Sequence, residues 1–106
     1  MAKYLLHVNY TLQGLKGVAA QGGSAREKAA REAAQSVGGS LDSFYFAFGD
    51  TDAVLIGDFP DHVSVAALAL AVGSGGGVSV RTTVLVTPKE IDEAAKKQVT
   101  YQPPAG

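Results

Sequence analysis

One stretch of the chain, residues 41–59, constrains the fold most, because it consists of two strand-forming segments around a short turn. Aromatic residues dominate the first segment, and residues 54–56 of the second are Val-Leu-Ile; both kinds of side chain favour β-strands. Between them, residues 49–52 are Gly-Asp-Thr-Asp, whose glycine and aspartates suit the backbone angles of a tight loop. The stretch predicts a β-hairpin at the centre of a small α+β domain.

Neither arm of this predicted hairpin alternates cleanly between apolar and polar residues. Alternating directions along the first arm place apolar residues on both faces: Phe44, Phe46 and Phe48 on one, Leu41, Tyr45 and Ala47 on the other. Strands that are apolar on both faces are usually covered on both faces. The helices of the chain supply one cover, and a second copy of the chain is the simplest source of the other.

Composition limits the class of protein. A chain of 106 residues, with 46% hydrophobic and 18% charged residues, predicts one ordered domain. We expect this domain over residues 1–100 and a C-terminal tail over residues 101–106, which contain two consecutive prolines. The formal net charge of −1 gives no basic surface for nucleic acid or for an anionic membrane. Neither is therefore expected as a partner.

Cysteine is absent, which excludes a disulfide framework, a thiolate metal site and a cysteine nucleophile. Because the chain has only two histidines besides, we expect no metal and no cofactor. The longest apolar stretch, residues 63–72, is far shorter than the about 20 residues that cross a bilayer. The first residues contain no apolar signal segment. These features predict a cytoplasmic protein.

The N-terminal part predicts a strand and a helix. Residues 3–10 alternate as a strand does, and residues 11–23 are glycine-rich and are expected to hold at most one helical turn. Ser24 and Glu27 have the spacing of a capping box, which predicts a helix over residues 25–37. An alanine stripe is expected to let this helix lie close to the sheet. Its solvent side is expected to carry Arg26, Lys28, Arg31 and Glu32.

After the hairpin, Asp61 is expected to cap a second helix over residues 62–72, with His62 on the surface. This helix is apolar nearly all round, which is typical of a helix buried on more than one side. The glycine-rich residues 73–77 lack the Gly-Lys-Ser/Thr of a phosphate-binding loop, so they predict a simple connection.

The C-terminal part predicts a strand followed by a helix. Residues 78–87 alternate cleanly between valine-rich and polar positions. Thr87 and Glu90 form a second capping box, with proline at the first helical position, and predict a last helix to about Val99. Its buried side is expected to carry Ile91, Ala94, Ala95 and Val99.

The predicted order is β-α-β-β-α-β followed by a C-terminal helix, which is the ferredoxin-like arrangement. In this topology the four strands form one antiparallel sheet, and the fourth strand pairs with the first. Both helices lie on one face of the sheet, so the other face is left open. An exposed face that spans four strands is large enough to be typical of an interaction site.

Four segments of the chain resemble the GYD domain family: residues 3–11, residues 38–61, the alanine-rich second helix and residues 81–90. The name-giving Gly-x-Tyr-Asp occurs here at residues 49–52, with Thr51 in place of the tyrosine. The resemblance implies a ferredoxin-like fold that assembles as a dimeric α/β-barrel. Related barrels include cofactor-independent oxygenases, isomerases and ligand-sensing domains, so the resemblance alone implies no particular reaction.

Five side chains of the predicted sheet are candidates for a ligand site: His7, Asn9, Tyr45, Arg81 and Thr83. His7 and Asn9 share the face of the first strand that Leu6 and Val8 do not occupy, and the pairing of strands one and four brings Arg81 near. Such a set around an apolar cavity suits recognition of, or proton transfer on, a small aromatic or enol-like acid. The alternative is that His7 is a satisfied core or interface histidine and Arg81 a solvated charge.

The turn carries two carboxylates, Asp50 and Asp52, after Gly49. Paired carboxylates can bind a hard cation or act as acid and base. The simpler interpretation is that these are turn residues, with Asp52 accepting hydrogen bonds from backbone N–H groups.

Three hypotheses for function follow. The first is a homodimer or higher homo-oligomer that binds a small apolar or aromatic molecule, as a regulatory domain does. The second is a cofactor-independent oxygenase or isomerase acting in the same cavity. The third is a purely structural oligomer. The absence of a recognisable nucleophile–base–orienter set in the sequence favours the first or the third.

Overall fold

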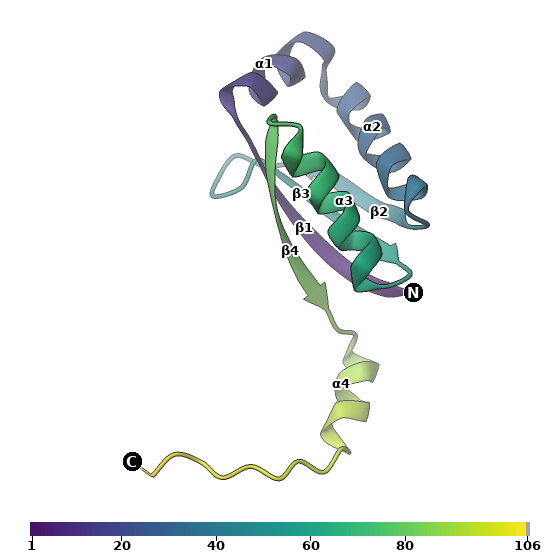
Figure 1. Cartoon of the computed structure of the whole chain (residues 1–106), viewed down its shortest axis with the longest axis vertical. Helices are drawn as coiled ribbons and strands as arrows, with labels where there is room; N and C mark the ends of the chain where they lie inside the picture. The colour runs from purple at the N-terminus through teal and green to yellow at the C-terminus, as the bar shows by residue number, and fades with distance from the viewer. Residues whose placement is uncertain (106) are drawn as a thin grey trace.

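The computed structural model describes residues 1–105 and has the α+β architecture that the sequence predicts (Figure 1). Its elements are, in order, β1 (Ala2–Tyr10), α1 (Leu12–Gln21), α2 (Gly23–Ser36), β2 (Ser40–Phe46), β3 (Ala53–Phe59), α3 (His62–Ser74), β4 (Val78–Leu85) and α4 (Pro88–Ala95). The strands form one antiparallel sheet in the order β2-β3-β1-β4. This is the ferredoxin-like topology, with β4 beside β1 as expected.

The core lies between the sheet and helices α2 and α3. It consists of ten buried hydrophobic residues: Tyr4, Leu6, Val8, Ala34, Leu41, Ala53, Leu55, Phe59, Val65 and Leu68. The Tyr4 and Phe59 rings meet edge to face, with their centroids 5.8 Å apart. Gly39 passes directly against Phe59, where an added Cβ would lie 2.5 Å from the ring. Glycine is therefore required at this close approach.

The N-terminal helices differ from the prediction. Residues 12–21 form a complete helix, α1, because the Thr11 side chain caps it by accepting a hydrogen bond from the Gly14 N–H. Helix α2 follows at once through Gly22, which turns the corner with a φ of 86°. Ser24 is therefore already inside α2, and the predicted capping box at Ser24 does not form. Glu27 pairs instead with Arg31 at 2.9 Å.

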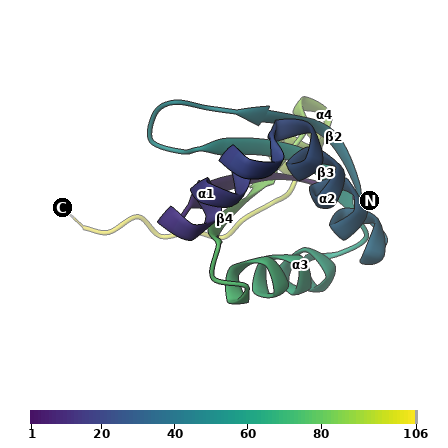
Figure 2. The same cartoon turned by 90° about the horizontal axis from the view of Figure 1, so that it is seen from above.

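The hairpin is confirmed, but Leu41 in its first arm points to the face of the sheet opposite to the predicted one. The register shifts between Leu41 and Ser43, which is a β-bulge. The bulge turns Leu41 toward the helices, on the same side as Phe44, and not toward the Tyr45 side as predicted. Strand β2 then ends at Phe46, so Phe48 lies in the loop with its side chain wholly exposed. Figure 2 shows this loop projecting beyond the sheet.

Helix α3 begins as predicted, since the Asp61 side chain accepts a hydrogen bond from the Ser64 N–H at 2.8 Å. His62 lies on the surface. Only Val65 and Leu68 of this helix are buried, while Leu70 is 74% exposed. The expected burial on more than one side is therefore not reached within a single chain.

The segment after β4, residues 86–105, is called the C-terminal arm here. Its capping box is confirmed at Thr87 and Glu90, but helix α4 ends at Ala95, and every residue of the arm is exposed. The predicted burial of Ile91, Ala94, Ala95 and Val99 is thus wrong, because the arm leaves the sheet instead of folding back on it (Figure 1). The radius of gyration is 16.9 Å, against about 13 Å for a compact chain of this length.

None of the helices in residues 1–105 combines the length and the hydrophobicity that a membrane span requires.

Candidate functional site

Three of the five candidate side chains lie in one row across the open face of the sheet. Cross-strand pairing puts His7 opposite both Arg81 and Val54, and Val54 is in turn opposite Tyr45. This face is the one without helices, because the neighbours of His7 along β1, Leu6 and Val8, are buried against the core. The row brings together side chains from all four strands.

The other two candidates occupy neighbouring positions on the same face. Thr83 is opposite Leu5, one row from Arg81. Asn9 is opposite Ser79, and its side-chain amide donates a hydrogen bond to the backbone carbonyl of Asp50 at 3.2 Å. Asn9 therefore ties the hairpin loop to β1, whereas Thr83 extends the polar edge of the row.

The loop between β2 and β3 overhangs one end of this row. A shallow depression is lined by His7, by Arg81 and by residues 47–51 of the loop. Its polar side chains are those of His7, Arg81, Asp50 and Thr51, and Phe48 supplies an exposed ring at its edge. The arrangement gives a partly covered patch where an imidazole and a guanidinium face the same space.

The His7 side chain has a polar atom without a hydrogen-bond partner within this patch. Its Nδ1 atom is buried, yet among residues 1–105 it has no hydrogen-bond partner. Leaving a buried polar atom unpaired costs about 1–3 kcal/mol. His7 is therefore not a satisfied core histidine within the described residues, and its alternative role as an interface histidine stays a prediction.

The turn residues have structural roles. The Asp52 side chain accepts a hydrogen bond from the Tyr10 N–H at 2.8 Å, as predicted, and the Asp52 N–H donates to the Val8 carbonyl at 2.9 Å. The Thr51 hydroxyl donates to the same Val8 carbonyl at 3.1 Å. Within residues 1–105 no cluster of three or more potential metal ligands occurs. These bonds hold the loop beside His7.

The opposite end of the open face is closed by an ion-pair network. The Lys3 ammonium is hydrogen-bonded to Asp42, on the bulge, and lies 3.2 Å from Asp58. These carboxylates, Asp42 first, raise the pKa of Lys3, and Lys3 lowers the pKa of Asp42. The centre of the face between the two ends is apolar, with half-buried Leu5 and Ile56.

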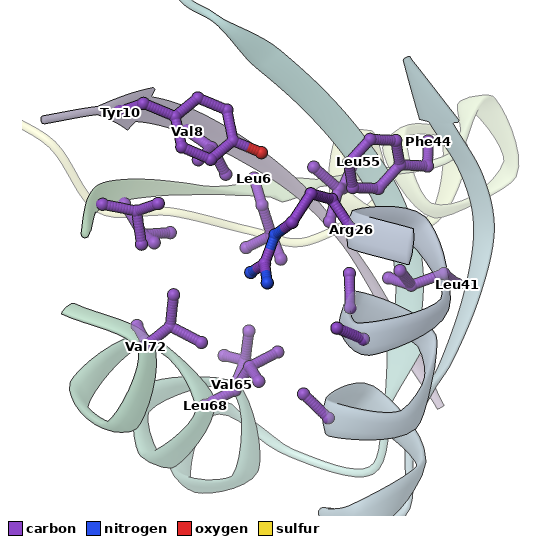
Figure 3. Close-up of a pocket in the computed structure, with 16 residues that line it drawn as sticks. Leu6, Val8, Tyr10, Arg26, Leu41, Phe44, Leu55, Val65, Leu68 and Val72 are labelled. Carbon is purple, nitrogen blue, oxygen red and sulfur yellow. The ribbon is translucent and has the colours of Figure 1, made fainter. Parts of the chain in front are cut away.

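A second hollow lies on the other face, between the sheet and helices α2 and α3, and the sequence prediction missed it. Arg26, expected on the solvent side of α2, lines this cavity together with Tyr10 (Figure 3). The signal was present in the spacing, because Arg26 shares one helical face with Ala29, Ala30 and Ala33, at i+3, i+4 and i+7. The small alanine side chains leave the space beneath them unfilled.

Comparison with protein families matches the GYD domain to residues 4–95, from β1 to the end of α4. No curated protein and no solved structure matches the chain. The loop at residues 49–52 is where the sequence departs from the name-giving motif. Here Thr51 binds the Val8 carbonyl through its hydroxyl, so the loop is anchored without a tyrosine.

Proposed function

This chain belongs to the GYD domain family, and we propose that it is a homodimeric domain that binds a small aromatic or enol-like acid on its open sheet face. One observation carries the proposal: the buried and unpaired Nδ1 of His7 lies on the strand directly opposite Arg81. Binding sites typically combine an apolar surface with a few convergent polar groups. The row from Tyr45 to Arg81 has this composition.

The chemistry of the row defines the ligand class. A guanidinium prefers a carboxylate or an enolate oxygen, which it binds through charge-assisted hydrogen bonds. The His7 ring, which lines the same depression as Arg81, offers a second hydrogen-bonding group to such a ligand. Val54 and Leu5 offer apolar surface for a flat ring beside these two groups. A small planar acid satisfies all three demands.

A second copy of the chain completes the site in this proposal. Apolar groups remain uncovered in three places: the centre of the open face, the outer side of α3 and the C-terminal arm. Their exposed or half-buried members include Leu5, Ile56, Val63, Leu70, Ile91 and Val99. Exposed apolar patches of this kind mark association sites. Two open faces packed together would enclose the row and exclude water from the ligand.

A cofactor-independent isomerase or oxygenase is a second candidate, and the direct pairing of His7 with Arg81 favours it. In such an enzyme His7 would remove a proton from the bound acid, and Arg81 would stabilise the enolate that forms. Turnover with salicylate-like or enol substrates would support this candidate, while binding without turnover supports the first. A purely structural oligomer would bind none of these molecules.

Salicylate is a suitable probe for the binding proposal, measured by calorimetry and by the shift in melting temperature. We expect a saturable response in the wild-type chain, loss of it in His7→Ala and Arg81→Ala, and partial recovery in Arg81→Lys. Lys28→Ala, on the exposed side of α2, is the matched control and should behave as wild type. An unchanged response in both His7→Ala and Arg81→Ala would overturn the proposal.

Sedimentation tests the assembly. Ile56→Lys puts a charge at the centre of the open face and should convert the dimer to a monomer, because an unpaired charge in an interface is strongly unfavourable. Leu12→Lys, on the exposed helix α1, is the matched change outside that face and should leave the dimer intact. A wild-type chain that sediments as a monomer at micromolar concentration contradicts the dimer.

A further inference from the structure

The cavity on the helix-covered face is separate from the open-face site, and we propose that it binds a small apolar monocarboxylic acid whose carboxylate pairs with Arg26. Figure 3 shows the guanidinium of Arg26 pointing from the first turns of α2 into the space between α2, α3 and the sheet. The hollow has a volume of about 160 Å³. It lies on the opposite side of the sheet from His7.

The walls of this cavity are apolar. They come from all four strands and from α2 and α3, and include Leu6, Val8, Ala30, Ala33, Leu68 and Val72. Apolar cavities of about 150 Å³ remain dry and accept a molecule of the size of benzene. The space therefore suits a phenyl ring or a short alkyl chain, and its small alanine side chains define how much of the ligand enters.

Arg26 is the feature that selects an acid. Its side chain is half-buried, and among residues 1–105 it forms no ion pair with a carboxylate. Its polar neighbour in the cavity is Tyr10, whose pKa is raised by burial, an effect that the Arg26 charge partly opposes. The Tyr10 hydroxyl interacts with the guanidinium, but it is neutral at neutral pH and so supplies no negative charge to balance it. A carboxylate entering the cavity would do so, through bidentate hydrogen bonds.

Packing around the start of α2 fixes the position of this cation. The Phe46 ring stacks on Tyr10, with centroids 6.3 Å apart and an interplanar angle of 26°. Gly23 also lies against Phe46, where an added Cβ would be 2.9 Å from the ring. The first turn of α2 is thereby held against the aromatic pair. Arg26, nearly one turn further along, is placed at the mouth of the cavity.

Hexanoate tests the proposal, with 1-hexanol as the neutral control of equal chain length, by calorimetry on the full chain. We expect hexanoate to bind the wild-type chain and Arg26→Ala to weaken it about tenfold or more, because a hydrogen bond to a charged group is lost. Arg26→Lys should recover part of the affinity. Hexanol should bind weakly to both forms. Equal binding of hexanoate and hexanol, or equal binding by wild type and Arg26→Ala, would overturn the proposal.

A second pair of variants tests the location. Ala33→Leu fills the cavity and should abolish hexanoate binding, whereas Ala25→Leu, exposed on the same helix, should not. Arg81→Ala should leave hexanoate binding unchanged, because Arg81 lies on the open face. If Arg81→Ala abolishes binding while Arg26→Ala does not, hexanoate occupies the open face and the proposal for Arg26 fails. Circular dichroism verifies that each variant is folded.

Discussion

The two faces of the sheet are built from the same strands but differ in burial and in polarity. On β1, Leu6 is 4% exposed against the helices, while its neighbour Leu5 is only half-buried on the open face. The helix-covered face buries nothing but hydrophobic residues, whereas the open face carries His7, Arg81 and an ion-pair network. Alternation along a strand thus places the buried hydrophobic core on one face and the exposed polar and charged groups on the other.

The largest expected effect is a difference in the free energy of unfolding between variants of the two faces. Leu6→Ala should lower the free energy of unfolding by about 2–5 kcal/mol, because it removes buried surface and enlarges a cavity that the alanines of α2 cannot fill. Leu5→Ala, the neighbouring position on the open face, should cost less in the monomer. Urea denaturation of both variants measures the difference. Equal losses would mean that both faces are buried in the unit that unfolds.

Close packing on the helix-covered face predicts the next effect. Gly39→Ala should destabilise the chain by about 1–3 kcal/mol, since the new Cβ meets the Phe59 ring and the Asp58 carbonyl. Gly17→Ala, in α1, has no atom within 4 Å of the added Cβ and should stabilise by about 0.5–1 kcal/mol. Thermal unfolding compares the two. A stabilised Gly39→Ala variant would contradict the tight contact with Phe59.

On the open face, function is expected to oppose stability. His7→Leu removes a buried nitrogen that has no partner and should raise the free energy of unfolding by about 1 kcal/mol. The same variant should lose the response to salicylate. Denaturation and calorimetry on one sample test both statements. A destabilised His7→Leu variant would indicate that the nitrogen is paired in the assembled protein.

The smallest effect concerns the ion-pair network of the open face. Lys3 lowers the pKa of Asp42 below its usual 3.8, so the pair stabilises the fold above that value and loses its contribution as pH falls through the folded pKa. The pKa of Lys3 is raised above 10.5, so the contribution is also lost as pH rises through that folded value. Asp42→Asn should slightly reduce the loss of stability as the pH falls. The free energy of unfolding measured between pH 2 and pH 6 tests this, and the same pH dependence in the variant and the wild type would contradict it.

Local signals predicted much of the fold. The caps at Asp61 and Thr87 and the hairpin around residues 49–52 were correct, because each depends on residues close in sequence. The capping box at Ser24 was wrong, since α1 runs directly into α2 and Gly22 takes the corner. A complete α1 was missed because its glycines weaken the helical signal.

The candidate site was predicted only as a set of residues. Strand alternation indicated that His7 and Arg81 share a face, but their direct pairing depends on the register between two strands that are distant in sequence. The direction of Leu41 depends on a bulge that no local pattern reveals. The cavity beside Arg26 depends on the separation of two helices that do not follow one another.

The amino-acid sequence by itself determined the order of the four strands, the helices α2, α3 and α4, and the family, because periodicity and capping are properties of neighbouring residues. Tertiary structure alone decided that His7 Nδ1 lacks a partner within residues 1–105, that Arg26 points inward and that the C-terminal arm leaves the sheet. Each of these depends on what distant segments place around a side chain. Contacts between segments that are distant in sequence, and not local propensity, therefore determine which polar side chains are buried, exposed or unpaired on each face.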